Sequence, residues 1–334
     1  MSFIYVTEQG AVIGKKGQRV VVSKDRETLA DVPANRVQGV LVFGNVQITT
    51  QAMRLMLESG VEMALFSGSG RLLGQITSPF PKNITLRQSQ YARAGDPAFV
   101  SDFAAIIVRA KIQNCLELIR EFSHNHPETD LTAEKDQLES TIRSVEARPD
   151  VDSLLGLEGA SARAYFSSFA KMIRTGFTFT GREKHPPPDP VNALLSLGYT
   201  MAFNEISSLL DGIGFDPFLG FFHQPRYGHA GLASDLCEEF RAPLTDRLTL
   251  YLINNRIIQP EDFQAHAPSG GVYLGHEPRK RYFEEYEKFV LRPMPVSDEN
   301  ESQMNIRRLF MRQAERLRHT LMTGEPYQPY LFRW

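Results

Sequence analysis

Along the first 78 residues, short runs of alternating apolar and polar side chains are separated by turn residues. Val20 and Val22 fall on one face of an extended segment, because side chains in a strand alternate with a period of two. The same pattern predicts strands over residues 3–7, 11–14, 19–23, 36–43, 61–66 and 72–76. One helix is expected among them, over 51–58, with Thr50 as its N-cap. This part of the chain is therefore β-rich.

Beyond about residue 80 the spacing of apolar residues changes to steps of three and four, which is typical of amphipathic helices. Segment 78–83 contains two prolines and no periodic pattern, so a linker is expected over 79–90. Helices are predicted over 100–124, 133–147, 156–173, 190–210, 232–254, 280–290 and 301–323. The expected fold is α+β, with a small β-rich domain over 1–78 followed by a larger all-α domain over 91–334.

Composition and charge narrow the class of protein. The 334 residues suffice for about two domains, and 42% hydrophobic with 23% charged residues is typical of a globular chain. Cys115 and Cys237 have no CxxC or Cys/His spacing, which argues against zinc ribbons, thioredoxin chemistry and disulfide scaffolds. Neither a signal peptide nor a membrane span is apparent, so a cytoplasmic protein is expected. A net charge of −2 means that nucleic-acid binding would need local basic patches.

Glu158 is the single carboxylate in an otherwise apolar and small-residue run, 154–162. Burying a carboxylate costs several kcal/mol unless it is paired or binds a cation. Its partner could be Arg163, a base on a neighbouring helix or a metal ion. The segment alone leaves these alternatives open.

A second candidate segment, 220–241, combines an imidazole, a Gly/Pro loop and an acidic helix. Asp235, Glu238 and Glu239 stand at i, i+3 and i+4, so they would share one helix face and repel one another unless a cation lies among them. The alternative is an acidic first turn that complements the helix dipole, with Ser234 as N-cap.

Two histidines flank this loop. His223 by itself could be an ordinary core residue, and His229 an ordinary loop residue. His223 together with the acidic helix and the distant Glu158 favours one shared site instead. Carboxylates with one imidazole and no thiolate favour Mg²⁺ or Mn²⁺ over zinc, and such an ion suits phosphoryl chemistry.

Basic residues gather in two ways. Arg308, Arg312 and Arg316 recur every four residues and predict a basic stripe on a helix, which could also be a solvated face. Arg163 belongs to a second basic group, which extends to Lys184. Both groups are candidate DNA-binding surfaces.

Other polar residues could complete the site. Arg226 and Arg241 flank the proposed ligands and suit phosphate oxygens, because the guanidinium is planar. Tyr165 and Tyr199 could orient a DNA end or stack on a base, although core packing is the simpler role. Asn192 lies at an expected helix start, where a purely structural role is the alternative.

Three blocks of sequence, residues 154–160, 187–196 and 220–241, together resemble the Cas-one family, the integrase-nuclease that CRISPR systems use to capture new spacers. The last block ends in Asp235-Leu236-Cys237-Glu238-Glu239-Phe240-Arg241. Residues 5–11 and 36–43 also look like the β-rich domain of that family. The order and spacing of the blocks carry the resemblance, which covers most of the chain.

The resemblance implies a catalytic set of Glu158, His223, Asp235 and Glu238. It also implies that Mg²⁺ or Mn²⁺ is held by Glu158, His223 and Glu238, with Asp235 beside them. Glu238 stands where other members can have aspartate, which bears on reach and geometry. The implied activity joins the 3′-hydroxyl ends of a short DNA fragment to the CRISPR repeat by transesterification and also cuts branched DNA.

The resemblance also implies partners. These are double-stranded and branched DNA, a second copy of the chain paired through the β-rich domain, and the Cas-two protein, which bridges two dimers into a heterohexamer. Whether an end-trimming nuclease acts first stays open. Two alternatives remain at this point, a catalytically idle DNA-bridging scaffold of the same fold and a phosphodiesterase for small substrates.

Overall fold

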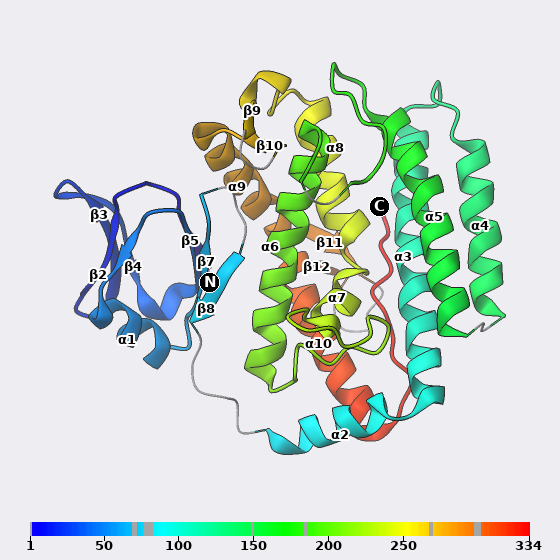
Figure 1. The fold of residues 1–334 in the computed structure, drawn as a ribbon, viewed down its shortest axis with the longest axis horizontal. Coiled ribbons are helices and arrows are strands. Elements are labelled where there is room, and N and C mark those ends of the chain that lie inside the picture. Colours follow the sequence, from blue (N-terminus) through cyan, green and yellow to red (C-terminus); the bar gives the residue numbers. More distant parts are fainter. Residues whose placement is uncertain are drawn as a thin grey trace. The chain divides into compact units, whose positions relative to one another are not determined.

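The protein, seen in a computed structural model, is described for residues 2–68, 72–76, 83–147, 150–183, 186–266, 270–296 and 302–334. It divides into two compact units, 1–80 and 81–334 (Figure 1). The division falls inside the proline-containing segment expected to link two domains. The expected linker over 79–90 is wrong in its second part, because helix α2 (Ile84–Ala94) begins there. The Asn83 side chain caps this helix by accepting a hydrogen bond from Leu86 N.

The first unit contains two four-stranded sheets. One has the order β1-β5-β7-β8, with parallel β1/β5 and β5/β7 pairs and an antiparallel β7/β8 pair. The other has the order β4-β3-β2-β6, and only its β2/β6 pair is parallel. The strands are β1 (Ser2–Val6), β2 (Val12–Lys16), β3 (Arg19–Lys24), β4 (Glu27–Pro33), β5 (Val37–Phe43), β6 (Gln47–Ile48), β7 (Glu62–Phe66) and β8 (Leu72–Ile76).

The core of this unit follows the alternating pattern. Val20 and Val22 of β3 are buried with residues of β5, β7 and helix α1 (Thr50–Glu58). The N-cap of α1 is Thr49 rather than the expected Thr50, since the Thr49 hydroxyl accepts from Ala52 N at 3.2 Å. Strand β4 escapes prediction because its residues are largely exposed and show no alternation, and β6 because it has only two residues.

The second unit is mainly helical. Helices α3 to α5 pack on one another, and α6 packs against α7 and α10. Besides α2, the helices are α3 (Pro97–Asn125), α4 (Thr132–Glu146), α5 (Val151–Met172), α6 (Pro190–Ile213), α7 (Gly231–Cys237), α8 (Arg247–Asn254), α9 (His276–Leu291) and α10 (Ile306–Thr323). A π-helical turn, Arg241–Asp246, leads into α8.

The expectation of an all-α second domain needs correction. Two short antiparallel ribbons occur in it, β9 (Phe263–His266) with β10 (Gly271–Leu274) and β11 (Pro293–Pro295) with β12 (Gln303–Asn305). The helix expected over 301–323 therefore begins only at Ile306, after the β12 strand. The helix expected over 232–254 is broken between α7 and α8.

No helix among the described residues is long and apolar enough to cross a membrane. Cys115 and Cys237 are buried free thiols on different helices. Burial is the main cause that raises the pKa of each thiol. Both groups are therefore kept in the neutral form.

Candidate active site in the helical unit

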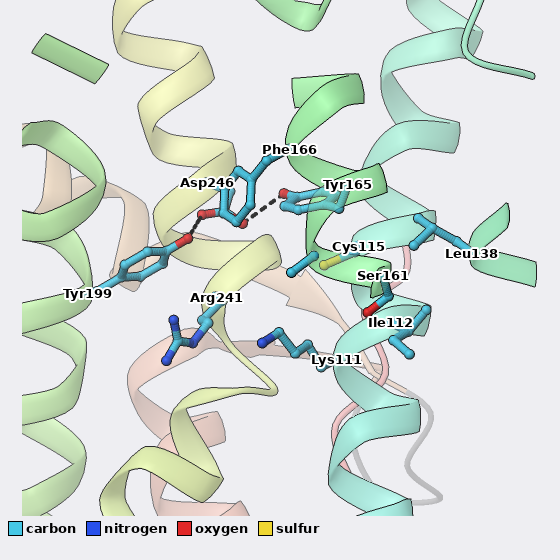
Figure 2. Close-up of a pocket in the computed structure, with 11 residues that line it drawn as sticks. Lys111, Ile112, Cys115, Leu138, Ser161, Tyr165, Phe166, Tyr199, Arg241 and Asp246 are labelled. Atoms are coloured by element: carbon cyan, nitrogen blue, oxygen red, sulfur yellow. Dashed lines mark hydrogen bonds between the residues drawn. The ribbon is translucent and has the colours of Figure 1, made fainter. Parts of the chain in front are cut away.

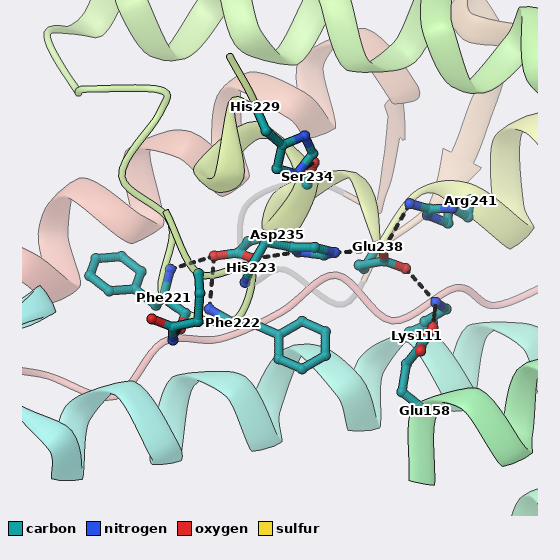
Figure 3. A network of polar contacts seen from close by, with 11 residues as sticks. Lys111, Glu158, Phe221, Phe222, His223, His229, Ser234, Asp235, Glu238 and Arg241 are labelled. Atoms are coloured by element: carbon teal, nitrogen blue, oxygen red, sulfur yellow. Dashed lines mark hydrogen bonds and ion pairs between the residues drawn. The ribbon is translucent and has the colours of Figure 1, made fainter. Parts of the chain in front are cut away.

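Glu158, His223 and Glu238 lie in one cluster, although they are far apart in the sequence (Figure 3). Glu158 comes from α5 and His223 from the loop before α7, and Glu238 is the C-cap residue directly after α7. His223 Nε2 is 3.8 Å from Glu238 Oε1. Lys111 lies on α3, and its amine forms ion pairs with the carboxylates of both Glu158 and Glu238. Lys111 thus links Glu158 to Glu238, which His223 faces, but among the described residues these three side chains do not surround one point that could hold a metal ion.

Lys111 is the member of the cluster that the sequence pattern did not reveal. Its Nζ donates a hydrogen bond to Glu158 Oε1 and lies 2.8 Å from Glu238 Oε2. Burial opposes its charge, but the carboxylates of Glu238 and Glu158 outweigh burial and raise the pKa of Lys111. The signal in the sequence is that Lys111 falls four residues after Ile107 and four before Cys115, on the apolar and buried face of α3. The partner of Glu158 is therefore a base on a neighbouring helix, whereas Arg163 is exposed.

Glu238 is the most buried of the three candidate ligands, with 3% of its side chain exposed. Burial raises its pKa, but Arg241, whose Nη2 is 2.9 Å from Glu238 Oε1, and Lys111 act more strongly in the opposite direction. The resulting pKa of Glu238 is about 2. This carboxylate is ionised throughout the neutral range.

Asp235 is fully buried and organises the loop before α7. Its carboxylate accepts hydrogen bonds from the backbone N–H groups of Phe221 at 2.7 Å, Phe222 at 3.1 Å and His223 at 2.8 Å. Its Oδ1 also lies 2.7 Å from Nδ1 of His223. A carboxylate bound to one imidazole nitrogen fixes the orientation of the ring. The other nitrogen of His223 consequently faces Glu238.

Two glycines permit this close folding of the loop. A side chain at Gly220 would place its Cβ 2.6 Å from the carbonyl carbon of Gly231 and 2.9 Å from Oδ2 of Asp235. Only glycine fits such an approach, because a Cβ atom would collide with backbone. The Gly/Pro composition of the loop thus serves the contact between the loop and α7.

The expectation that Asp235, Glu238 and Glu239 share one helix face is wrong. Helix α7 ends at Cys237, so the three carboxylates diverge instead of lining one helix face. Glu239 accepts hydrogen bonds from the Tyr327 hydroxyl at 2.6 Å and from Gln313 Nε2 at 2.9 Å. It fastens the C-terminal tail and takes no part in the cluster.

Ser234 is also not the N-cap of this helix. The helix begins at Gly231 with Ala230 as the residue before it. Ser234 Oγ lies instead 3.1 Å from Nε2 of His229. His229 is half-buried and contacts Ser234.

A pocket adjoins the cluster and contains a second buried carboxylate, Asp246 (Figure 2). The hydroxyls of Tyr165, at 2.7 Å, and Tyr199 both donate to it. Burial raises the pKa of Asp246 to about 6, although the hydroxyls and Arg241 act against burial. The pocket is lined by Lys111, Ile112, Cys115, Leu138, Ser161, Ala162, Tyr165, Phe166, Tyr199, Arg241 and Asp246. Asp246 escaped prediction because the preceding residues, 242–245, form no motif that marks a functional carboxylate.

The supporting residues differ in role. Tyr165 is buried and Tyr199 is half-buried, and the hydroxyls of both orient the carboxylate of Asp246. Asn192 holds the segment before α6, since it donates to Gly181 O at 2.9 Å and accepts from Glu183 N at 2.9 Å. Its role is structural.

The predicted DNA-binding arginines fall into two places. Arg241 belongs to the cluster and lies 4.9 Å from the centre of the Tyr199 ring, while Arg226 is exposed on the neighbouring loop. Arg308, Arg312 and Arg316 follow one another along α10, and Arg308 is exposed. Arg163 is exposed on α5, and Lys184 of the second basic group lies outside the described residues.

The cluster meets some but not all requirements of a metal site. Within the described ranges, no three His, Cys, Asp or Glu side chains are arranged to hold a metal ion, and the amine of Lys111 occupies the place between the two glutamates. The donors nevertheless suit Mg²⁺ or Mn²⁺, namely two carboxylates and an imidazole held by Asp235. Oε2 of Glu238 is buried and has no hydrogen bond. The residues fit a hard divalent ion, provided that Lys111 moves.

A protein-family model, that of the CRISPR associated protein Cas1, matches residues 4–288. The chain belongs to the Cas1 family. Curated relatives include a CRISPR-associated endonuclease Cas1 of Chlorobaculum tepidum, 34% identical over 295 residues, which make up 86% of each chain. A CRISPR-associated exonuclease Cas4/endonuclease Cas1 fusion of Geobacter sulfurreducens is 35% identical over 85% of this chain. The matched part is 52% of the fusion protein, so the chain spans about half of that relative.

Solved structures of Cas1 proteins share the fold. A Cas1 protein from Thermotoga maritima superposes with a TM-score of 0.84 and 20% identity, over 99% of this chain and all of the other. A chain of a Cas6-RT-Cas1--Cas2 complex superposes with a TM-score of 0.83 and 26% identity, over 98% of this chain and 36% of the other. The resemblance seen in the sequence and the α+β fold class are confirmed.

Proposed function

We propose that this Cas1-family chain is a metal-dependent DNA endonuclease and integrase, which inserts new spacers into a CRISPR array by attack of 3′-hydroxyl ends on the repeat, in antiviral defence. The observation that carries the proposal is the cluster in which Lys111 links Glu158 to Glu238 and His223 faces Glu238, formed by residues from separate segments of the chain. The names of the curated relatives, which include endonuclease and exonuclease–endonuclease fusion, support it.

Glu158, His223 and Glu238 would hold Mg²⁺ or Mn²⁺. Such an ion lowers the pKa of a bound hydroxyl and neutralises charge on phosphoryl oxygens. The chain contributes orientation. Asp235 fixes the His223 ring, and Arg241 is held between Glu238 and the face of Tyr199. A guanidinium fixed in this way is suited to bind a phosphate oxygen and the charge that develops on it.

The proposed partners are DNA, a second copy of the chain paired through its β-rich unit, and a Cas2 protein. A solved Cas6-RT-Cas1--Cas2 complex contains a chain of this fold. An end-trimming nuclease is a further partner, which the Cas4 fusion of a relative supports. Contacts to the DNA backbone through arginines would supply affinity, and DNA shape or partners would supply sequence preference.

A strand-joining assay tests the function. A repeat-containing plasmid, short DNA fragments and Mg²⁺ or Mn²⁺ are incubated with the wild type, Glu158→Ala and His223→Ala. Both variants should lose activity by roughly 100-fold or more, as expected when a metal ligand or its support is removed. Equal activity of all three proteins would refute the assignment.

Matched controls come from the same unit. Glu277→Ala and His276→Ala remove a glutamate and a histidine that contact each other at the start of α9, where Glu277 is exposed and His276 is half-buried. Their activity should stay within about twofold of the wild type, since surface substitutions alter stability little. Circular dichroism of all four variants verifies that they fold.

A catalytically idle DNA-bridging scaffold is the second candidate. The observation that favours it is the amine of Lys111, which pairs with both glutamates in the place a metal would need. Calorimetric titration with Mn²⁺ separates the two functions, since a scaffold would bind no Mn²⁺. If the chain is a scaffold, the Glu158→Ala variant would also bind DNA like the wild type.

A further inference from the structure

We propose that Lys111 is a built-in substitute for the metal ion. Its ammonium neutralises Glu158 and Glu238 while no divalent ion is bound, and moves into the neighbouring pocket when an ion binds. The inference rests on the proposed function, because it presumes a metal site at these carboxylates. It assigns to Lys111 a role in setting metal affinity.

The first step of the argument is charge. Glu238 is almost fully buried and Glu158 is only 24% exposed, and both lie against the same amine. Two buried carboxylates facing one point destabilise the fold unless a cation compensates them. Arg241 compensates Glu238 at Oε1, and Lys111, from α3, is the cation that reaches both carboxylates. The metal-free site is thereby stable as folded.

The second step is the quality of the two contacts. The amine forms a hydrogen bond with Glu158, whereas Oε2 of Glu238 is 2.8 Å from the amine yet has no hydrogen bond of proper geometry. The pairing with Glu238 is thus a contact between charges. A divalent ion carries twice the charge of an ammonium and can bind both carboxylates together with the imidazole of His223. Such an ion is the stronger partner for the cluster.

The third step is the space available to Lys111. The pocket beside the cluster is lined by Lys111 and also by Asp246, Tyr165 and Tyr199 (Figure 2). The four-carbon stem of lysine is flexible, so the ammonium can leave the glutamates without unfolding of α3. In the pocket it would approach the carboxylate of Asp246 and the oxygens of the two tyrosines. A displaced Lys111 therefore still has polar partners.

The test is the affinity for Mn²⁺, measured by isothermal titration calorimetry on the full chain. Lys111→Met removes the competing charge but keeps the length of the side chain, and should bind Mn²⁺ at least about tenfold more tightly than the wild type, which is about 1.4 kcal/mol. Lys171→Met is the matched control. Lys171 pairs at 2.6 Å with Glu134, which is 10% exposed, so this variant breaks a lysine–glutamate contact away from the site and should keep the wild-type Kd.

The outcomes separate the inference from the function on which it rests. Binding by the wild type with equal or weaker binding by Lys111→Met overturns the role of Lys111 and leaves the metal site standing. No binding by either protein overturns the metal-dependent function. Lys111→Gln, a neutral side chain that can still donate to Glu158, provides the same comparison if the Met variant does not fold. A variant that folds only in the presence of Mn²⁺ supports the proposal, since the ion then replaces the missing charge.

Discussion

Asp246 is a single buried residue that makes the stability of the protein depend on pH. It is fully enclosed, and its carboxylate is held by the hydroxyls of Tyr165 and Tyr199. Burial raises its pKa from 3.8 to about 6. A carboxyl group whose folded pKa lies above its unfolded value favours the folded state at low pH. The stability that it contributes is complete below about pH 4 and is lost as the pH rises through about 6.

We therefore expect Asp246→Asn to remove this dependence on pH. The difference between the melting temperatures of the variant and the wild type should shift by ~5 °C in favour of the variant from pH 4 to pH 7. This is the effect of a pKa shift of this size on a chain of this length. Differential scanning calorimetry across that range measures it. Tyr165→Phe removes a hydroxyl that lowers the pKa of Asp246, so this pKa should rise further in the variant. The pH range over which the Tyr165→Phe variant loses stability should therefore extend to higher pH. Identical pH profiles for wild type and Asn variant would contradict the assignment.

At the scale of elements, the C-terminal tail and α3 hold the break between α7 and α8. Asn114 of α3 donates to Glu239 O at 2.7 Å and to Tyr330 O at 3.0 Å, and accepts from Phe332 N at 2.8 Å. Glu239 in turn accepts from Tyr327. The residue that follows Glu238 is thus fixed from two directions. The position of Glu238 depends on elements far from it in the sequence.

Asn114→Ala should lower the free energy of unfolding by about 3 kcal/mol, since it removes three buried hydrogen bonds worth about 1 kcal/mol each. Urea denaturation followed by circular dichroism measures the change. Asn125→Ala is the matched control, because Asn125 ends the same helix, is exposed and donates only to Glu121 O among the described bonds. This control should cost less than about 0.5 kcal/mol. Equal effects of both substitutions would show that the tail is not held through Asn114.

At the scale of the whole molecule, affinity for DNA must come from the segregation of charge, because the net charge is −2. The arginines at 308, 312 and 316 follow one another along α10, Arg241 belongs to the cluster, and Arg226 is exposed on the loop before α7. Each phosphate neutralised by a cation releases counterions and steepens the dependence of binding on salt. An enzyme for small substrates would lack this steepness.

Arg308→Ala should weaken binding to duplex DNA and lower the slope of log K against log salt by about 0.9, the contribution of one phosphate contact. Fluorescence anisotropy at several salt concentrations gives the slope. Arg318→Ala is the control on the same helix, where Arg318 pairs with Glu315 at 2.6 Å, and its slope should equal that of the wild type. Activity independent of salt in the wild type would instead favour the phosphodiesterase for small substrates.

Features that depend on neighbouring residues could be predicted from the amino-acid pattern alone. Periods of two and of three to four residues predicted the six strands and most of the helices, because a half-buried strand or helix must repeat its apolar residues at the period of its backbone. Glu158 and His223 were also visible, as polar groups in apolar surroundings. Strand β4 and the two ribbons of the second unit lacked such a period and were missed.

Which charged groups lie next to one another depends on how the helices pack. Lys111 and Asp246 belong to the site because α3 and the π-helical turn bring them there, and no local pattern encodes that approach. Glu239 looked like a third acid of the cluster, but the end of α7 at Cys237 directs it to the tail. Pairing between ionised groups depends on distance in space, which the chain sets through packing across more than a hundred residues. The period of a sequence carries no record of that distance.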